Sequence, residues 1–165
     1  MSKGNSSMQL TRAADYAIRV MVELARDDQR RVSLSTLAAE TETPESFLSK
    51  VLQALARADL IDSQRGHAGG FTLSATGRAA NVRQVVEAIE GPIALNVCVG
   101  AGQHCARNLY CPAHPVWARA QRAMLRELEC ATIADMALQR RYVVPHVPAP
   151  LLEVSSLPDC TEPAD

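Results

Sequence analysis

Three of the chain's five cysteines lie in one short segment, Cys98–His114, whose sequence is CVGAGQHCARNLYCPAH. Six residues separate Cys98 from Cys105, five separate Cys105 from Cys111, and His114 follows three positions later. Thiolate and imidazole groups are ligands of zinc and of iron–sulfur clusters. Zinc sites usually pair their cysteines two residues apart. The wider spacing here therefore favours an iron–sulfur cluster held by three thiolates, with one position left to another ligand.

Two alternatives to an iron–sulfur cluster remain open at this point. Zinc is the closest alternative as a metal, and a reactive thiol without any metal is the other. Unrelated core cysteines are disfavoured, because the segment is rich in glycine and polar residues. Residues 1–12 contain no apolar stretch typical of a secretory signal, so we expect a cytoplasmic protein, where clustered cysteines more often bind metal or react than form structural disulfides.

The composition is typical of a globular protein with one modest domain and an appendage. Of 165 residues, 47% are hydrophobic and 21% are charged, and no apolar run approaches the roughly 20 residues of a membrane span. The net charge of −1 is unevenly distributed. Residues 12–83 carry ten Lys or Arg and nine Asp or Glu, whereas residues 142–165 carry four acids and no Lys or Arg. The overall charge therefore does not argue against an anionic partner for the first half of the chain.

The first part of the chain carries apolar residues at helical spacing. This pattern predicts an amphipathic helix over 11–26 with Thr11 as its N-cap. A short second helix is predicted over 34–41, capped by Ser33 or Ser35.

A third helix and a hairpin complete a winged helix-turn-helix pattern. The sequence TPES predicts a helix start with Thr43 as N-cap and Pro44 as its first helical residue. The glycine-rich stretch over 61–73 predicts a β-hairpin. Two short helices joined by a tight turn, followed by such a wing, indicate a DNA-binding domain.

The third helix is the candidate recognition helix, whose first turns would enter a DNA major groove. Its first hydroxyl and free amides suit a phosphate oxygen, and an arginine at the wing tip suits a narrow minor groove. The residues expected to bind DNA are Thr43, Glu45, Ser46, Ser49, Lys50, Arg65 and His67. The alternative is a solvated helix face beside a plain flexible hairpin.

The second half of the chain predicts a long helix suited to joining two subunits. Helices are predicted over 82–90, from about 115 to 129, and over 131–139. One apolar stripe of the long helix has too few partners inside a small winged-helix domain, so we expect it to form a dimer interface. The stripe consists of Trp117, Ala120, Met124 and Leu128. The alternative is that it packs back on its own domain.

The expected fold is mainly α with a small β-wing, a winged helix-turn-helix plus a long dimerisation helix. Its organisation would be a flexible lead-in at 1–7, the DNA-binding domain at 8–80, a connecting helix at 81–97, the cysteine loop at 98–114, dimerisation helices at 115–141 and a disordered acidic tail at 142–165.

These segments together resemble the family of iron–sulfur-cluster winged-helix transcriptional regulators, from residue 8 to about residue 140. The resemblance rests on MQLTRAADYAIRVM, TPESFLSKVLQAL, DSQRGHAGGFTL, VRQVVEAIEGP and the three cysteines ahead of a long helix. It implies a homodimer that crosses its long helices and binds a palindromic operator in double-stranded DNA. It also implies that the state of the cluster tunes the affinity for DNA.

The resemblance makes Cys98, Cys105 and Cys111 the three cluster ligands, but leaves two choices for the fourth. His114 stands where the family's iron–sulfur assembly repressor supplies a histidine to a [2Fe–2S] cluster, and CPAHPVW is similar to that member's pattern. Asp15 stands where the nitric-oxide-sensing member supplies an aspartate from the partner subunit to a [4Fe–4S] cluster. We expect His114 and [2Fe–2S], with Asp15 and [4Fe–4S] as the alternative.

Two positions depart from the family pattern. The first cysteine gap holds six residues instead of the usual five, and Ser49 stands where the assembly repressor has a glutamate tied to its change of operator preference, so we do not expect that change here.

The function expected from the sequence is a homodimeric repressor whose operator affinity is tuned by a redox-, nitric oxide- or iron-sensitive cluster. The alternative is a zinc- or thiol-based winged-helix regulator without a cluster. An electron-transfer protein would need no wing or recognition helix. An enzyme is not expected, because the chain has no phosphate loop, no paired carboxylates in a glycine-framed turn and no nucleophile motif.

Overall fold

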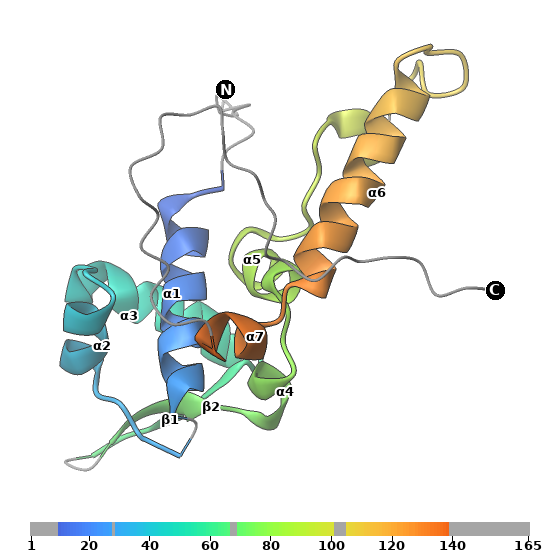
Figure 1. Ribbon diagram of the computed structural model, residues 1–165. Helices are drawn as coiled ribbons and strands as arrows, with labels where there is room; N and C mark the ends of the chain where they lie inside the picture. Colours follow the sequence, from blue (N-terminus) through green and yellow to red (C-terminus); the bar gives the residue numbers. More distant parts are fainter. Residues whose placement is uncertain (1–9, 28, 67–68, 101–104, 139–165) are drawn as a thin grey trace, which may run out of the picture.

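The computed structural model describes residues 10–27, 29–66, 69–100 and 105–138. Seven α-helices, a two-stranded hairpin and one 3-10 turn form the described part of the chain (Figure 1). In chain order they are α1 (Arg12–Arg26), α2 (Leu34–Glu40), α3 (Glu45–Arg57), β1 (Ile61–Gln64), β2 (Gly70–Leu73), α4 (Ala75–Arg78), α5 (Val82–Glu90), η1 (Val97–Val99), α6 (His114–Cys130) and α7 (Ile133–Leu138). The expected lead-in at 1–7, the tail at 142–165 and His67 lie outside the described residues.

The mainly α fold with a small β-wing is confirmed. Among the described helices, none is long and apolar enough to cross a membrane. Two short elements, α4 and η1, were not expected from the sequence. Each follows a polar cap that satisfies backbone amides over a single turn: Ser74 accepts from the amide of Gly77, and Asn96 accepts from the amide of Val97.

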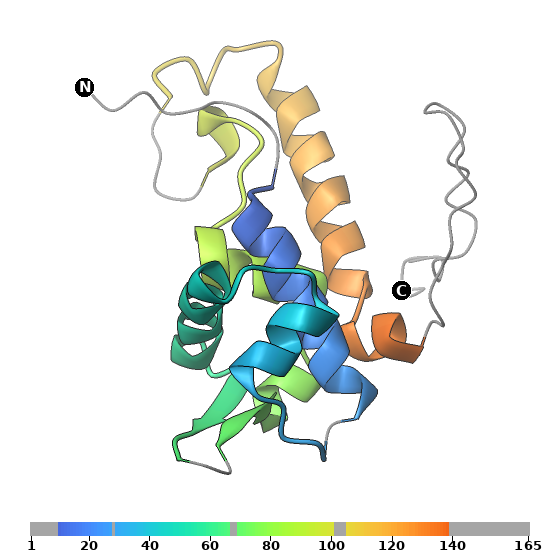
Figure 2. The same cartoon turned by 90° about the vertical axis from the view of Figure 1, so that its left-hand side faces the viewer.

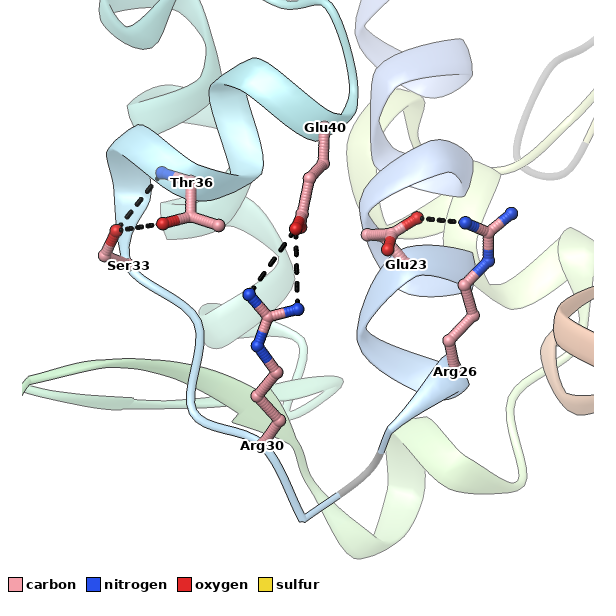
Figure 3. Close-up of polar contacts among 6 residues, drawn as sticks. All are labelled: Glu23, Arg26, Arg30, Ser33, Thr36 and Glu40. Atoms are coloured by element: carbon pink, nitrogen blue, oxygen red, sulfur yellow. Dashed lines mark hydrogen bonds and ion pairs between the residues drawn. The ribbon is translucent and has the colours of Figure 1, made fainter.

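Side-chain caps begin three of the longer helices. The Thr11 side chain accepts from the amide of Ala14, and the Ser33 hydroxyl accepts from the amide of Thr36 at 3.1 Å (Figure 3). At the start of α5, Asn81 and Gln84 form a reciprocal capping box. The predicted caps Thr11 and Ser33 are therefore confirmed.

Helix α1 is the centre of the fold, with α2, α3, β2, α5 and α7 packed around it (Figures 1 and 2). Its buried face repeats at helical spacing, so that one helix contributes to the packing of both halves of the domain. The residues of this face, all at most 1% exposed, are Ala14, Ala17, Val20, Met21 and Leu24. A second, smaller cluster forms where Ala14 meets Val82 and Val86 of α5.

The wing is an antiparallel hairpin in which Ile61 pairs with Leu73 and Gln64 pairs with Gly70. Val32, ahead of α2, exchanges two backbone hydrogen bonds with Phe71 on the other side of β2. Gly70 makes this approach possible, because a Cβ atom there would lie 2.6 Å from the Val32 carbonyl oxygen. The base of the wing is thus fixed to the domain on both sides of β2.

The turn between α2 and α3 differs from the sequence prediction at Thr43. The Thr43 amide donates to the carbonyl of Ala38 and the Glu42 amide to that of Ala39, while Glu42 takes a positive φ of 54°. This pattern is a Schellman motif, which ends α2. Thr43 therefore belongs to the end of α2, and its prediction as the N-cap of α3 is wrong. Pro44 occupies the cap position, without a side-chain cap, instead of the first helical position.

We predict that Glu42→Gly raises the free energy of unfolding by about 0.5 kcal/mol. A glutamate in the left-handed region costs about 1–2 kcal/mol, which the greater chain entropy of unfolded glycine partly offsets. Urea unfolding monitored by circular dichroism measures the change.

Asp59→Gly is the matched control, because Asp59 has a φ of 57° at the end of α3 but also accepts a hydrogen bond from the Thr76 hydroxyl at 3.1 Å. Its substitution loses that bond and should give no gain. Equal stabilisation by both variants would contradict the explanation from turn geometry.

Candidate DNA interface and cysteine loop

The N-terminal half of α3 presents most of its predicted DNA-binding residues to solvent. Glu45, Ser46 and Lys50 are exposed, while Ser49 is half-buried and its hydroxyl donates to the carbonyl of Ser46 at 3.1 Å. On the inner face, Leu48, Val51, Leu52 and Leu55 anchor the helix in the core. Amphipathic packing thus orients one polar face of α3 outward.

Thr43 does not belong to this exposed set. It is 4% exposed, and its hydroxyl donates to the carbonyl of Thr41 at 3.2 Å within the turn. A buried hydroxyl that already donates to the chain is unsuited to a phosphate contact. The turn that places Thr43 at the end of α2 also buries its side chain.

The wing lies beside the middle of α3. Arg65 follows β1 directly and is exposed, whereas His67 lies outside the described residues. A pocket of about 150 Å³ lies between α3, the hairpin and the start of α2, and its lining includes Ser49, Gln53 and Ser63. Gln53, exposed one turn after Ser49, continues the polar face and was not singled out from the sequence. Its position four residues after Ser49 was the signal that could have identified it.

An aromatic pair joins α1 to the start of α3. Phe47 is 39% exposed, and its ring meets the edge of Tyr16 at a centroid distance of 5.5 Å and an angle of 77°. The Arg19 guanidinium lies 5.9 Å from the Tyr16 ring centre and pairs with Asp15 at 2.9 Å. The Asp15 and Arg19 side chains are each about half exposed, so this ion pair adds little stability.

The cysteine loop leads from η1 to the first turn of α6. Cys98 lies in η1, which packs on α6, and Cys111 lies three residues before the helix begins. Cys98, Cys105 and Cys111 are all free thiols of intermediate burial. In both views this loop lies at the end of the molecule opposite the wing (Figures 1 and 2).

Two buried polar atoms of this loop have no hydrogen-bond partner among the described residues, His114 Nδ1 and Asn108 Oδ1. Buried polar atoms are nearly always paired, and an ion or ligand is one reason for an exception. His114 is the first residue of α6, and its backbone amide donates to the carbonyl of Cys111 at 3.1 Å. The loop therefore offers free thiols and one unpaired imidazole nitrogen, a donor set whose chemistry fits an iron–sulfur cluster.

The structure does not bring these donors together. Within residues 10–27, 29–66, 69–100 and 105–138, no three His, Cys, Asp or Glu side chains are grouped so that they could hold one metal ion. Residues 101–104, between Cys98 and Cys105, lie outside the described part. Asp15 is exposed on α1 and paired with Arg19.

The predicted dimerisation stripe on α6 divides between two environments. Leu128 packs on the small cluster around Val86 of its own chain, which is the alternative considered from the sequence. Trp117 and Met124 are half-buried, and Ala120 is exposed. Val116, 54% exposed and one turn before Ala120, extends the uncovered apolar surface.

Ion pairs and backbone bonds fix the base of α6 to α5. Arg83 pairs with Glu129 of α6 and, at 3.2 Å, with Glu87 of its own helix. The hydrogen bonds to Glu129 and Glu87 raise the pKa of Arg83 further above its usual value. Next to this pair, the amide of Val82 donates to the carbonyl of Ala131 at 2.9 Å.

Solved structures with the same fold include bacterial regulators. The structure of CymR, the global cysteine regulator of B. subtilis, is 27% identical with a TM-score of 0.63, and covers 79% of this chain and 97% of that one. The T. potens IscR structure has a TM-score of 0.62 over 81% of this chain and 88% of that one, and at 23% identity it shows the fold alone. These neighbours confirm the winged-helix fold.

Curated relatives are transcriptional regulators, not enzymes. A putative HTH-type regulator of Mycobacterium tuberculosis, Rv1287, is 35% identical over 132 residues, which cover 79% of this chain and 81% of that protein. The regulator NsrR of Geobacillus kaustophilus is 31% identical over 135 residues, covering 81% of this chain and 92% of that protein. Residues 10–139 match the Rrf2 family, described as iron-dependent transcriptional regulators. The resemblance found in the sequence is thereby confirmed, and this chain belongs to the Rrf2 family of transcriptional regulators.

Proposed function

We propose that this Rrf2-family regulator is a cytoplasmic homodimeric repressor whose affinity for a palindromic operator depends on an iron–sulfur cluster. The observation that carries the proposal is the donor set of the loop: three free thiols and a buried imidazole nitrogen without a partner, all ahead of α6. Cys98, Cys105, Cys111 and His114 would hold the cluster. When bound, such a cluster supplies a group sensitive to redox state, nitric oxide or iron supply.

His114 is the fourth ligand that the structure supports better. Its Nδ1 is buried and unpartnered, and its position is tied to Cys111 by a backbone hydrogen bond. Asp15 would have to give up Arg19 and approach from the partner subunit. A [2Fe–2S] cluster with one histidine is therefore proposed, and a [4Fe–4S] cluster with Asp15 is the alternative.

DNA would be bound by the polar face of α3 and by the wing. Lys50 and Arg65 are exposed cations suited to phosphates or a narrow groove, while Glu45 and Ser46 face outward where base edges would lie. Ser49, half-buried one turn after Glu45, stays in the proposed set. His67 stays in the proposed set from the sequence alone. Thr43 does not, since its hydroxyl is buried.

The dimer would form through α6. This helix extends beyond the other helices at its N-terminal end (Figure 1), and its half-buried or exposed apolar residues lack sufficient cover within the described chain. Trp117, Ala120, Met124 and Val116 would meet their counterparts there, whereas Leu128 packs mainly on its own domain. Each subunit would then present one α3 to one half-site.

A thiol-based regulator without a cluster is the second candidate. It is favoured by the likeness to CymR of B. subtilis, a global cysteine regulator. Cys98, Cys105 and Cys111 are free thiols that could react in this way.

Substitution of any one loop cysteine by alanine should abolish the cluster, because two thiolates are too few to hold it. We expect colour and acid-labile sulfide in wild-type protein prepared without oxygen, and neither in Cys98→Ala, Cys105→Ala or Cys111→Ala. The matched control, Cys160→Ala, should retain both. Colourless wild-type protein with stoichiometric zinc would support the zinc alternative, and metal-free protein that still responds to a thiol oxidant would support the thiol-based one.

His114→Ala should bleach the cluster or speed its loss, while Asp15→Ala should leave the visible spectrum unchanged. The reason is that His114 offers an unpaired ring nitrogen beside the loop, whereas Asp15 is paired on α1. Absorption spectra recorded over time under argon measure the difference. The reverse result would make the ligand set cross the dimer interface and favour [4Fe–4S].

Arg65→Ala should weaken operator binding by about 1–3 kcal/mol and lower the salt dependence of the affinity, because one cation no longer displaces counterions. Fluorescence anisotropy with operator DNA at several salt concentrations measures both. Arg119→Ala, which removes the same charge from exposed α6, is the matched control and should change little. If the two variants behave alike, the wing has no part in binding.

Met124→Lys should give monomers that bind a palindrome poorly, because the charge would be buried without a partner in the α6 interface. Sedimentation velocity measures the oligomeric state. Ala134→Lys adds the same charge on the exposed face of α7 and should remain dimeric. A dimeric Met124→Lys protein would place the interface elsewhere.

A further inference from the structure

A buried glutamine on α6 holds the segment that leads into the cysteine loop. Gln121 is 7% exposed, and among the described residues of α6 it is the only one that is buried. Its Nε2 donates to the carbonyl of Ile93 at 2.7 Å, and its Oε1 accepts from the amide of Leu95 at 2.8 Å. One side chain thus pairs with two backbone groups as a neighbouring β-strand would.

The same segment is also bound from the other side. The Ile93 amide donates to Glu87 Oε1 of α5 at 3.3 Å. Glu87 in turn pairs with Arg83, which reaches Glu129 at the base of α6. Ile93 is therefore held between α5 and α6, and Gln121 supplies two hydrogen bonds that tie this segment to the middle of α6.

The position of Gln121 matches the distance that the loop must cover. From Gln121 back to His114, α6 rises by about 10 Å. From Leu95 to Cys98, three residues of chain reach at most about 10–11 Å. The pairing with Leu95 therefore keeps Cys98 within reach of the turn that carries His114. Asn96, which caps η1 through the amide of Val97, then fixes the local conformation around Cys98.

We propose that Gln121 is a positioning residue for the cysteine loop, which sets the spacing between the Cys98 limb and the Cys111–His114 limb. This inference rests on the proposed function, in that the two limbs would close on one cluster. Gln121 touches no ligand itself. It acts through the backbone of Ile93 and Leu95, and its loss would leave these two groups without a partner beside an apolar helix face.

The first test is cluster retention. Gln121→Leu keeps the size of the side chain and removes both hydrogen bonds, so the cluster should be lost to a chelator about 10- to 100-fold faster than in wild-type protein. Gln121→Glu keeps an acceptor for the Leu95 amide and removes the donor to Ile93. This variant replaces Gln121→Leu in the test if the leucine variant fails to fold. The matched control is Gln84→Ala, which removes a glutamine-to-backbone bond from the capping box of α5, away from the loop.

The second test needs no cluster. Phenylarsine oxide binds two thiols only where they can approach each other, so its affinity for reduced, metal-free protein reports the spacing of the loop. We expect Gln121→Leu to lower this affinity about tenfold or more and Gln84→Ala to leave it unchanged. Hydrogen exchange at the Leu95 amide should rise in Gln121→Leu and stay unchanged in Gln84→Ala.

The outcomes separate the inference from the proposed function. If wild-type protein takes up no cluster but its arsenical affinity depends on Gln121, the proposed function fails and the positioning role stands. If a cluster forms and Gln121→Leu loses it at the wild-type rate, the positioning role is overturned and the proposed function stands. If Gln121→Leu and Gln84→Ala change cluster loss and arsenical affinity equally, the effect comes from general stability and the positioning role is overturned. Wild-type protein that binds neither cluster nor arsenical would overturn both.

Discussion

The burial of α1 is the constraint on which the rest of the structure depends. Ala17, Val20 and Met21 of α1 are each 0% exposed, and α3, α5 and α7 all pack on this helix. Small residues at positions such as Ala17 let the neighbouring helices approach closely, so a larger side chain there would strain several contacts at once. The start of α1 is also tied to the end of α5, because the Thr11 amide donates to Glu90 at 2.7 Å. Helix α3, the proposed recognition helix, and the helices that flank the cysteine loop therefore share one support.

Much of this fold was predictable, because local chemistry decides where its helices begin and end. The side chains of Thr11 and Ser33 accept from backbone amides that have no partner inside the helix, and these residue types are typical of helix starts in a sequence. The hairpin was equally predictable, because glycines lie between two short extended stretches over residues 61–73. The turn at Thr43 was not, because Thr-Pro fits a helix start as well as the end of a preceding helix. The positive φ of Glu42, an uncommon residue for that conformation, decided it.

The candidate site could be proposed from its residue types, but its geometry could not be predicted from the sequence. Cysteine spacing indicated candidate donors, but the distances between them depend on how two limbs of the chain are held on α6. The polar residue Gln121 inside an apolar helical face was the visible signal for that arrangement, and its partners, the backbone groups of Ile93 and Leu95, carry no sequence signature at all.

The separation of the wing from the cysteine loop limits how one could influence the other. The two lie at opposite ends of the described chain (Figures 1 and 2), so no direct contact within a subunit can couple them. Coupling has to act through the placement of α6 relative to the domain. That placement depends on the packing of Leu128 against α5, the Arg83–Glu129 pair, the bond between Val82 and Ala131, and the clamp made by Gln121. The ion pair fixes the base of α6 to α5, and the clamp fixes the middle of α6 to the segment that follows α5. A change in the loop that displaces Leu95 would therefore tilt α6 about its fixed base.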